Sequence, residues 1–318
     1  MSENISLAGS AATVLVTPPE PHQSHKPEVF GNLYKFFSEE GGRLTEMTWA
    51  QHAFHESRRW SVVEMIDAID LENISDSDKL FVWNAGRAEL TTKPGADRLT
   101  RLADKECRYW QSRDPALAAI MQSCGTWSRY WNEEEAHHEA AFGVISRVLG
   151  LESISNDTFI EFRKVFPDDD MLRTLFLLAI SEITAAVNYG SCAKRAKDAG
   201  LSALFKQVAA DEIQHMRYFL TFARGLVVSQ QYPARNAFAV AHFFLREDGD
   251  LQGSLREKVE KRESHVNWWD HLEVAGIEDA ENLSRKAQMI FAALRQVTDI
   301  EVNSAEEVER TWMEMVGC

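Results

Sequence analysis

Prolines are concentrated at the start of the chain, and this distribution leaves the rest free to form long helices. Four of the 8 prolines lie within the first 27 residues, and the other four are far apart. A proline inside a helix removes a backbone hydrogen bond and clashes with the preceding turn, so its scarcity permits helices of many turns. Strand signals are poor, because no Asn-Gly or Asp-Gly pair stands between alternating apolar segments. The sequence therefore predicts an all-α fold.

Four long helices are predicted in the middle of the chain, where apolar residues recur at helical spacing. Pro94-Gly95 would bend or end the first helix, whereas Pro115 suits the first turn of the second and Gly150 its end. The expected ranges are about 79–94, 115–149, 170–200 and from 202 onward. Long helices with short connections are typical of a bundle, against which further helices near the C-terminus would pack.

The chain is expected to form one domain behind a flexible arm. Residues 1–28 contain four prolines and are predicted to be that arm. Residues 29–318 would form a single helical domain, with its core at about 75–228 and packing helices at about 229–318. A hydrophobic content of 45% is sufficient for a sizeable core.

Charge and cysteine usage exclude several classes of protein. A net charge of −15 argues against nucleic acid or an anionic membrane surface as the main partner. No apolar run approaches the roughly 18 residues that span a bilayer, and the start lacks the basic and apolar regions of a signal peptide. Four widely spaced cysteines form neither a disulfide framework nor a zinc pattern. We therefore expect a soluble cytoplasmic protein with free thiols.

Two Glu-x-x-His motifs carry the clearest chemical signal. Glu135 and His138 form the first motif, and Glu212 and His215 form the second. Residues i and i+3 share one face of a helix, so each pair could reach one ion. A carboxylate with a neutral imidazole suits a divalent transition metal. Each motif follows another acid within a long predicted helix, and this combination is far rarer than a single motif.

Two further glutamates would complete a site between four helices. Glu182 lies on an otherwise apolar face of the helix between the motifs, where an unpaired charge is costly to bury. Glu89 is the candidate on the first helix. Four carboxylates would balance the charge of two divalent ions, and the two histidines would add ligands without charge.

The first motif can be read in two registers. Glu134 and His137 form an overlapping Glu-x-x-His, rotated by about 100° around the helix. Trp131 shares a face with Glu135 and His138 and favours their register, but periodicity alone leaves both open.

The segments around these residues resemble a known family, the soluble acyl-(acyl carrier protein) desaturases, within the ferritin-like diiron carboxylate proteins. Residues 127–138 (WSRYWNEEEAHH) are similar to the family's Trp-x-Arg-x-Trp-x-x-Glu-Glu-x-x-His helix, and the match favours Glu135 and His138. Residues 209–215 (AADEIQH) resemble its Ala-Asp-Glu-x-x-His segment, and residues 182–197 resemble the helix with the lone glutamate. The helix of Glu89 matches more weakly.

This resemblance implies a ferritin-like four-helix bundle core with additional packing helices, and a centre of two iron ions that activates O2 and abstracts hydrogen from a C–H bond. The implied metal ligands are Glu89, Glu135, His138, Glu182, Glu212 and His215. Asp211 would hydrogen-bond His138, and Trp60 matches a tryptophan near the family's electron-entry route. Thr184 stands one place before the position of a family threonine associated with oxygen handling. A ferredoxin-like electron donor, an acyl substrate on a carrier protein and a homodimer are also implied.

Other functions remain open at this point. Ala185 replaces the family's threonine, and no basic, proline-containing C-terminal segment is evident. One alternative is therefore a diiron oxygenase or N-oxygenase that acts on a small amine, amino acid or aromatic compound. Another is a non-catalytic bundle that binds or stores metal, because fold does not fix function. Manganese could replace iron. His52 and His55, three residues apart, are interpreted as surface or core residues of a helix.

Overall fold

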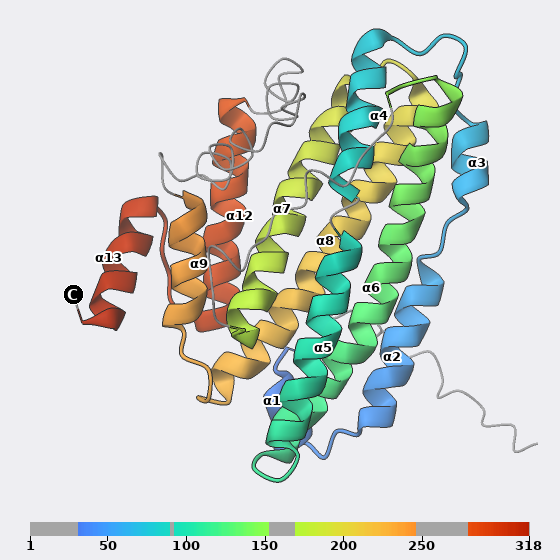
Figure 1. The fold of residues 1–318 in the computed structure, drawn as a ribbon. Helices are drawn as coiled ribbons and strands as arrows, with labels where there is room; N and C mark the ends of the chain where they lie inside the picture. Colours follow the sequence, from blue (N-terminus) through green and yellow to red (C-terminus); the bar gives the residue numbers. More distant parts are fainter. Residues whose placement is uncertain (1–30, 90–91, 153–168, 246–278, 318) are drawn as a thin grey trace, which may run out of the picture.

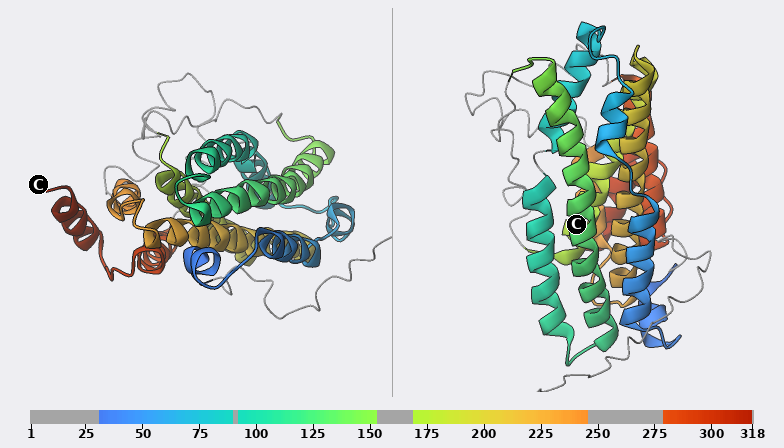
Figure 2. Two further views of the ribbon diagram at one scale, coloured as in Figure 1. Left: turned by 90° about the horizontal axis from the view of Figure 1, so that it is seen from below. Right: turned by 90° about the vertical axis from the view of Figure 1, so that its right-hand side faces the viewer.

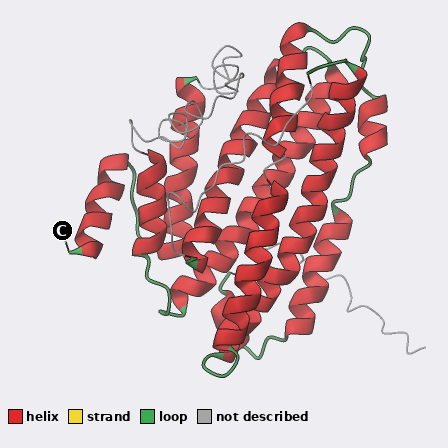
Figure 3. Ribbon diagram, viewed as in Figure 1, coloured by secondary structure: helices red, strands yellow, loops and turns green. Residues whose placement is uncertain are grey.

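The computed structural model of the chain describes residues 31–89, 92–152, 169–245 and 279–317. All secondary structure within these ranges is helical, which confirms the predicted all-α class (Figure 3). The helices are α1 (Leu33–Ser38), α2 (Leu44–Ser57), α3 (Val62–Asp67), α4 (Asp76–Glu89), α5 (Thr92–Trp110), α6 (Pro115–Val148), α7 (Met171–Arg195), α8 (Ala199–Val228), α9 (Arg235–Leu245), α12 (Ala280–Thr298) and α13 (Ala305–Val316). The predicted N-terminal arm, residues 1–28, lies outside the described residues.

The longest helices lie side by side, with shorter helices on both flanks (Figures 1 and 2). α7 and α8 are closely packed partners, while α4 and α5 follow one another along α6. α2 and α3 lie on one flank, and α9, α12 and α13 lie on the opposite flank. The predicted C-terminal packing helices are therefore present: α12 packs on α7 and α8, and α13 packs on α9.

The boundaries of α6 follow from its local sequence. Asp114 is the N-cap, and its carboxylate accepts hydrogen bonds from the N–H groups of Ala116 at 3.0 Å and Leu117 at 3.1 Å. Pro115 fits the first turn because that position needs no N–H donor. Gly150, with φ of +64°, follows the helix in the left-handed region that favours glycine. The predicted range of about 115–149 is thus confirmed.

The first predicted helix is wrong in its extent. α4 ends at Glu89, and a separate helix that was not predicted begins at Thr92. Pro94 lies in the first turn of α5, where proline is tolerated, so it marks the beginning of a helix and not an end. Leu99 and Ala103 of α5 are buried at helical spacing and belong to its packed face.

The connection between α7 and α8 comes earlier than predicted. α7 ends at Arg195 and not near Gly200, and α8 begins at Ala199. The cause is Asp198, whose carboxylate accepts a hydrogen bond from the N–H of Leu201 at 2.7 Å. Such a cap satisfies a donor that helix geometry leaves free, so the helix starts directly after it.

Gly200 is required by a close approach between α8 and the end of α3. A Cβ atom at this position would lie 2.1 Å from the carbonyl oxygen of Ala68. We expect Gly200→Ala to lower the free energy of unfolding by about 1–3 kcal/mol, because backbone atoms must move to admit the methyl group. Gly143→Ala on α6 is the control, since nothing lies within 4 Å of its added Cβ. Equal urea midpoints for the two variants would contradict this prediction.

The sequence of α7 is apolar enough to raise the question whether the helix crosses a membrane or lies in the protein core. It is the one helix in the described part of the chain that could cross a membrane by length and composition. However, 72% of its most apolar 18-residue stretch is buried inside the molecule, where α7 packs against α8, α9 and α12. Such burial is typical of the core helix of a soluble protein.

A layer of polar side chains divides the apolar core in two. Along α6, Glu135 and His138 lie between Trp131, which belongs to one apolar cluster, and Ala141, which belongs to the other. The second Glu-x-x-His motif is placed in the same way on α8, which runs from the second cluster into the first. Since burial of charged groups without partners is costly, the residues of this layer need one another or a ligand.

Candidate metal centre

Six buried side chains from four helices meet in the polar layer. α4 contributes one glutamate, α7 contributes another, and α6 and α8 contribute one Glu-x-x-His motif each. No member is more than 6% exposed. The structure thus brings together all six predicted ligands, namely Glu89, Glu135, His138, Glu182, Glu212 and His215.

These side chains form two groups that share two carboxylates. The first group, called site A, consists of Glu89, Glu135, His138 and Glu212, and the second, called site B, consists of Glu135, Glu182, Glu212 and His215. Within each group the candidate ligand atoms lie within 4.8 Å of one another, and each group could hold a metal ion. The two glutamates of the Glu-x-x-His motifs are the shared members.

Each shared carboxylate turns one oxygen toward each site. Glu135 places Oε2 at 3.3 Å from Nδ1 of His138 and Oε1 at 3.0 Å from Nδ1 of His215. Glu212 does the same, with Oε1 at 3.4 Å from His138 and Oε2 at 3.1 Å from His215. Both glutamates therefore have the orientation of ligands that bridge two ions.

The chemistry of the donors fits metal ions. Nδ1 of His138 is fully buried and makes no hydrogen bond within the described residues, although carboxylate oxygens of Glu135, Glu212 and Glu89 lie 3.3, 3.4 and 3.7 Å away. A ring nitrogen that faces three carboxylates in this way has the position expected of a metal ligand. Carboxylates and imidazoles together suit divalent transition metals.

Two outer acids orient the histidines, and each acts across the helix pair. Asp211 on α8 lies 3.2 Å from Nε2 of His138 on α6. Glu134 on α6 lies 2.8 Å from Nε2 of His215 on α8. An acid bound to the ring nitrogen that does not face the metal fixes the ring, so that the other nitrogen points toward the metal.

This arrangement accounts for the two overlapping registers of the first motif. Glu135 and His138 face the two sites, while Glu134 is buried because it holds the histidine of the other motif. His137 joins neither site and lies beside Trp60, with 6.0 Å between ring centroids. The hydrogen bond predicted between Asp211 and His138 is present.

Helix α2 and the residues after it cover the outer acids. His55 places Nδ1 at 2.8 Å from Glu134, and Trp60 donates its ring N–H to Asp211 at 2.8 Å. Arg58 joins the two acids, because its guanidinium contacts Glu134 at 3.3 Å and also donates to Asp211. A cavity of about 10 Å³ lies among these side chains, and this is room for about one water molecule.

Two other predicted residues differ in their placement. Trp60 lies over His138 with 6.2 Å between ring centroids and an interplanar angle of 15°. Trp60, Asp211 and His138 therefore form one connected chain of contacts, because Asp211 hydrogen-bonds to both rings. The structure does not bring Thr184 to the cluster. Its hydroxyl donates to the carbonyl of Ile180 on its own helix at 3.1 Å.

Sequence reasoning missed His55, Arg58 and Tyr189. The first two reach the outer acid of α6 across more than 70 residues, and Tyr189 hydrogen-bonds to Glu89 across 100. The i, i+3 spacing of His52 and His55 was a weak signal that one face of their helix carries polar contacts. No local pattern marked Arg58 or Tyr189.

Burial and mutual contacts shift the proton affinities within the cluster. Burial first, and then repulsion by Glu135, raise the pKa of Glu89 well above its ordinary value. Burial, with repulsion by Glu212, does the same to the pKa of Glu182. Burial alone would lower the pKa of His138, but the hydrogen bond from its ring to Asp211 and the nearness of the other carboxylates outweigh it and raise that pKa well above the usual range.

The pKa of His215 is raised for the same reason, by Glu134, Glu135 and Glu212. We therefore expect the metal-free protein to lose stability as the pH rises above about 5. The folded state retains protons that the unfolded chain releases near its ordinary pKa values of 4.5 for Glu and 6.5 for His. A folded state that binds more protons than the unfolded state is destabilised by rising pH.

The carboxylates with a lowered pKa, Glu134, Glu135 and Asp211, act on the acid side and not in this window, because their contribution is lost only as the pH falls. Burial lowers the pKa of His137, so this one group opposes the trend, and only below its ordinary value of 6.5.

Thermal unfolding of chelator-treated protein against pH would measure the slope. The double variant Glu89→Gln with Glu182→Gln should have a smaller slope. A stability that rises with pH would contradict the prediction.

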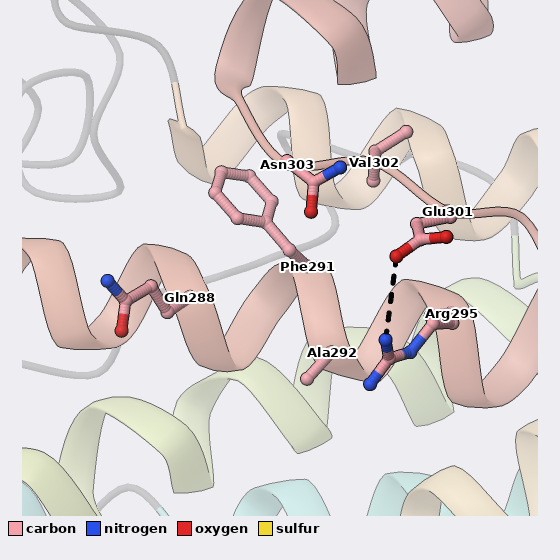
Figure 4. Close-up of a pocket in the computed structure, with 7 residues that line it drawn as sticks. All are labelled: Gln288, Phe291, Ala292, Arg295, Glu301, Val302 and Asn303. Carbon is pink, nitrogen blue, oxygen red and sulfur yellow. Dashed lines mark ion pairs between the residues drawn. The ribbon is translucent and has the colours of Figure 1, made fainter.

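A second hollow is lined by residues outside the four helices that form the cluster. Figure 4 shows it on α12 and the segment that follows, with a volume of about 330 Å³. Its charged members, Arg295 and Glu301, lie 3.7 Å apart in an ion pair. It contains no histidine or cysteine and therefore lacks the donors of a transition-metal site.

No protein-family model, curated protein or solved structure matches the chain. The resemblance to the desaturases therefore stays a prediction that rests on the motifs.

Proposed function

We propose that this protein is a ferritin-like four-helix bundle that holds two iron ions at sites A and B and works as an O2-dependent oxidase. Its reaction would resemble that of acyl-(acyl carrier protein) desaturases, with removal of hydrogen from a C–H bond of an acyl-type substrate. The observation that carries the proposal is the pair of four-residue groups that share Glu135 and Glu212. Glutamates from two helices and Glu-x-x-His from two others are the ligand set of diiron carboxylate bundles.

The iron ions, when bound, would supply the reduction of O2 and the oxidising power for C–H cleavage. The protein's own side chains would set the conditions. Asp211 and Glu134 would hold the two histidines in their ligating orientation. The apolar clusters on both sides of the layer would exclude water from the reaction. Trp60 is half-buried and continuous with His138 through Asp211, which supports a route for electrons from outside.

The redox partner of this proposal is a ferredoxin-like donor, and the substrate is bound to an acyl carrier protein or is a free small molecule. We further propose a cytoplasmic homodimer. The three described cysteines, Cys107, Cys124 and Cys192, are free thiols, as expected in a reducing compartment.

A second candidate is a diiron oxygenase or N-oxygenase for a small amine, amino acid or aromatic compound. The placement of Thr184 favours it, because this hydroxyl is engaged with Ile180 and does not reach the cluster. The desaturase-like handling of oxygen by a threonine would then be absent. A non-catalytic metal-binding or storage bundle is the third candidate, with manganese as a possible occupant.

Anaerobic metal loading followed by O2 tests the proposal. Purified protein is loaded with ferrous iron, the iron is counted per chain, and O2 is admitted in a stopped-flow absorbance instrument. Two irons per chain and a transient visible band, whose decay an added substrate accelerates, are expected. Absence of stoichiometric iron, or iron without a response to O2, would overturn the oxidase. Iron far above two per chain would indicate storage.

A further inference from the structure

Tyr189 contacts the cluster although it is not one of the candidate ligands. It lies on α7, seven residues after Glu182, so both side chains are on the same face of the helix. Its side chain is buried, and its hydroxyl donates a hydrogen bond to Oε1 of Glu89 on α4. This bond connects the two helices that contribute only one glutamate each.

Aromatic packing holds the phenol in this position. The ring of Tyr189 stacks on Phe142, with 5.9 Å between centroids, and on Phe205, with 6.1 Å. The interplanar angle is 26° in both pairs. Phe142 and Phe205 also contact each other, with 5.4 Å between centroids, so the three rings form a triangular cluster. A ring packed against two others in a close-packed core keeps one orientation.

The two carboxylate oxygens of Glu89 have different partners. Oε1 accepts from Tyr189, while Oε2 is the oxygen 3.7 Å from Nδ1 of His138. One oxygen is thereby fixed, and the other is presented to site A. A carboxylate held in this way needs little rearrangement to bind an ion, because its orientation is already determined.

Glu182 in site B is held differently. Within the described residues no hydroxyl, amide or ring N–H donates a hydrogen bond to its carboxylate. Neither of its oxygens is therefore fixed in the way that Tyr189 fixes Oε1 of Glu89. Metal ligands must be correctly oriented, and site B meets this condition less well than site A.

We propose that Tyr189 is a positioning residue that presents Glu89 as a one-oxygen ligand, so that site A binds its metal ion before site B. This inference rests on the proposed two-metal centre and adds the order in which the sites fill. Loss of a hydrogen-bonding partner of a metal ligand typically weakens metal affinity by about 10- to 100-fold. The same factor is expected for site A when the phenol hydroxyl is removed.

Cobalt(II) titration of the metal-free full-length chain under anaerobic conditions tests this order, by calorimetry and by the visible absorption of the bound ion. Wild-type protein should bind two ions in two steps. Tyr189→Phe should weaken the first step by about 10- to 100-fold and leave the second nearly unchanged. The matched control is Tyr232→Phe, because Tyr232 is also buried and donates to a carboxylate, Glu106, at 2.7 Å outside the cluster.

A second variant assigns the steps to the sites without relying on Tyr189. Glu182→Ala removes a ligand that belongs to site B alone, so the tight step and its spectrum should survive and the weak step should disappear. Thermal unfolding of each metal-free variant confirms that the fold is retained.

Three results would overturn the proposal. They are equal affinity of the two wild-type sites, an unchanged first step in Tyr189→Phe, and loss of the tight step in Glu182→Ala. In each of these cases the wild-type protein still binds two ions, and the proposed function survives. Wild-type protein that binds no cobalt, iron or manganese would instead overturn the proposed metal centre and the filling order with it.

Discussion

Glu135→Ala should remove both metal ions from the protein, whereas Glu182→Ala should remove only one. Glu135 belongs to both sites, and its two oxygens face the two histidines at 3.3 and 3.0 Å. Its loss leaves each site one carboxylate short and also removes the charge that lies between the ions. Since buried cations need compensating ligands, neither site should retain stoichiometric metal.

Iron counting after anaerobic loading and gel filtration measures this effect. Glu139→Ala is the matched control, because Glu139 lies one turn further along α6 and is exposed. Wild type and Glu139→Ala should contain two irons per chain, Glu182→Ala one, and Glu135→Ala none. Two irons in Glu135→Ala would show that the metals bind elsewhere.

Arg58→Ala should lower the free energy of unfolding by about 3 kcal/mol, because removal of one partner leaves buried charges uncompensated. The Arg58 side chain is 16% exposed and lies between Glu134 and Asp211, whose side chains are 9% and 3% exposed. Both acids keep their histidine partners, but they lose the one arginine that joins them.

Arg59→Ala is the control for this prediction. Arg59 is the next residue in the chain, but its side chain is 48% exposed and pairs with Glu133 and Glu56 at the surface. Exposed ion pairs contribute little to stability, so this variant should unfold close to wild type. Urea unfolding of both variants, metal-free, gives the comparison, and equal midpoints would show that Arg58 does not compensate the outer acids.

Local periodicity made much of this protein predictable. The Glu-x-x-His pairs needed only the helical repeat to be placed on one face, and Glu182 was visible as a charge within an apolar stripe. The structure places all these residues in one buried layer. The boundaries of α6 followed from Pro115 and Gly150, because the residues that begin and end a helix act locally.

The features that escaped prediction depend on contacts between distant segments. His55 and Arg58 reach Glu134 across 79 and 76 residues, and neither belongs to a periodic pattern that points there. The start of α5 was missed for a different reason. Pro94 is compatible with both the end and the first turn of a helix, and only packing against α6 decides between them.

The crossed placement of the outer acids has a consequence for how the protein matures during synthesis. The histidine of α6 is held by an acid of α8, and the histidine of α8 by an acid of α6. A nascent chain that ends at α7 therefore carries three glutamates and one histidine of the cluster, with no acid of α8 to orient that histidine and no second motif. Iron delivered at that stage would find an incomplete set of ligands. The completion of α8 is the event that creates both sites together, so loading belongs to the finished, folded chain.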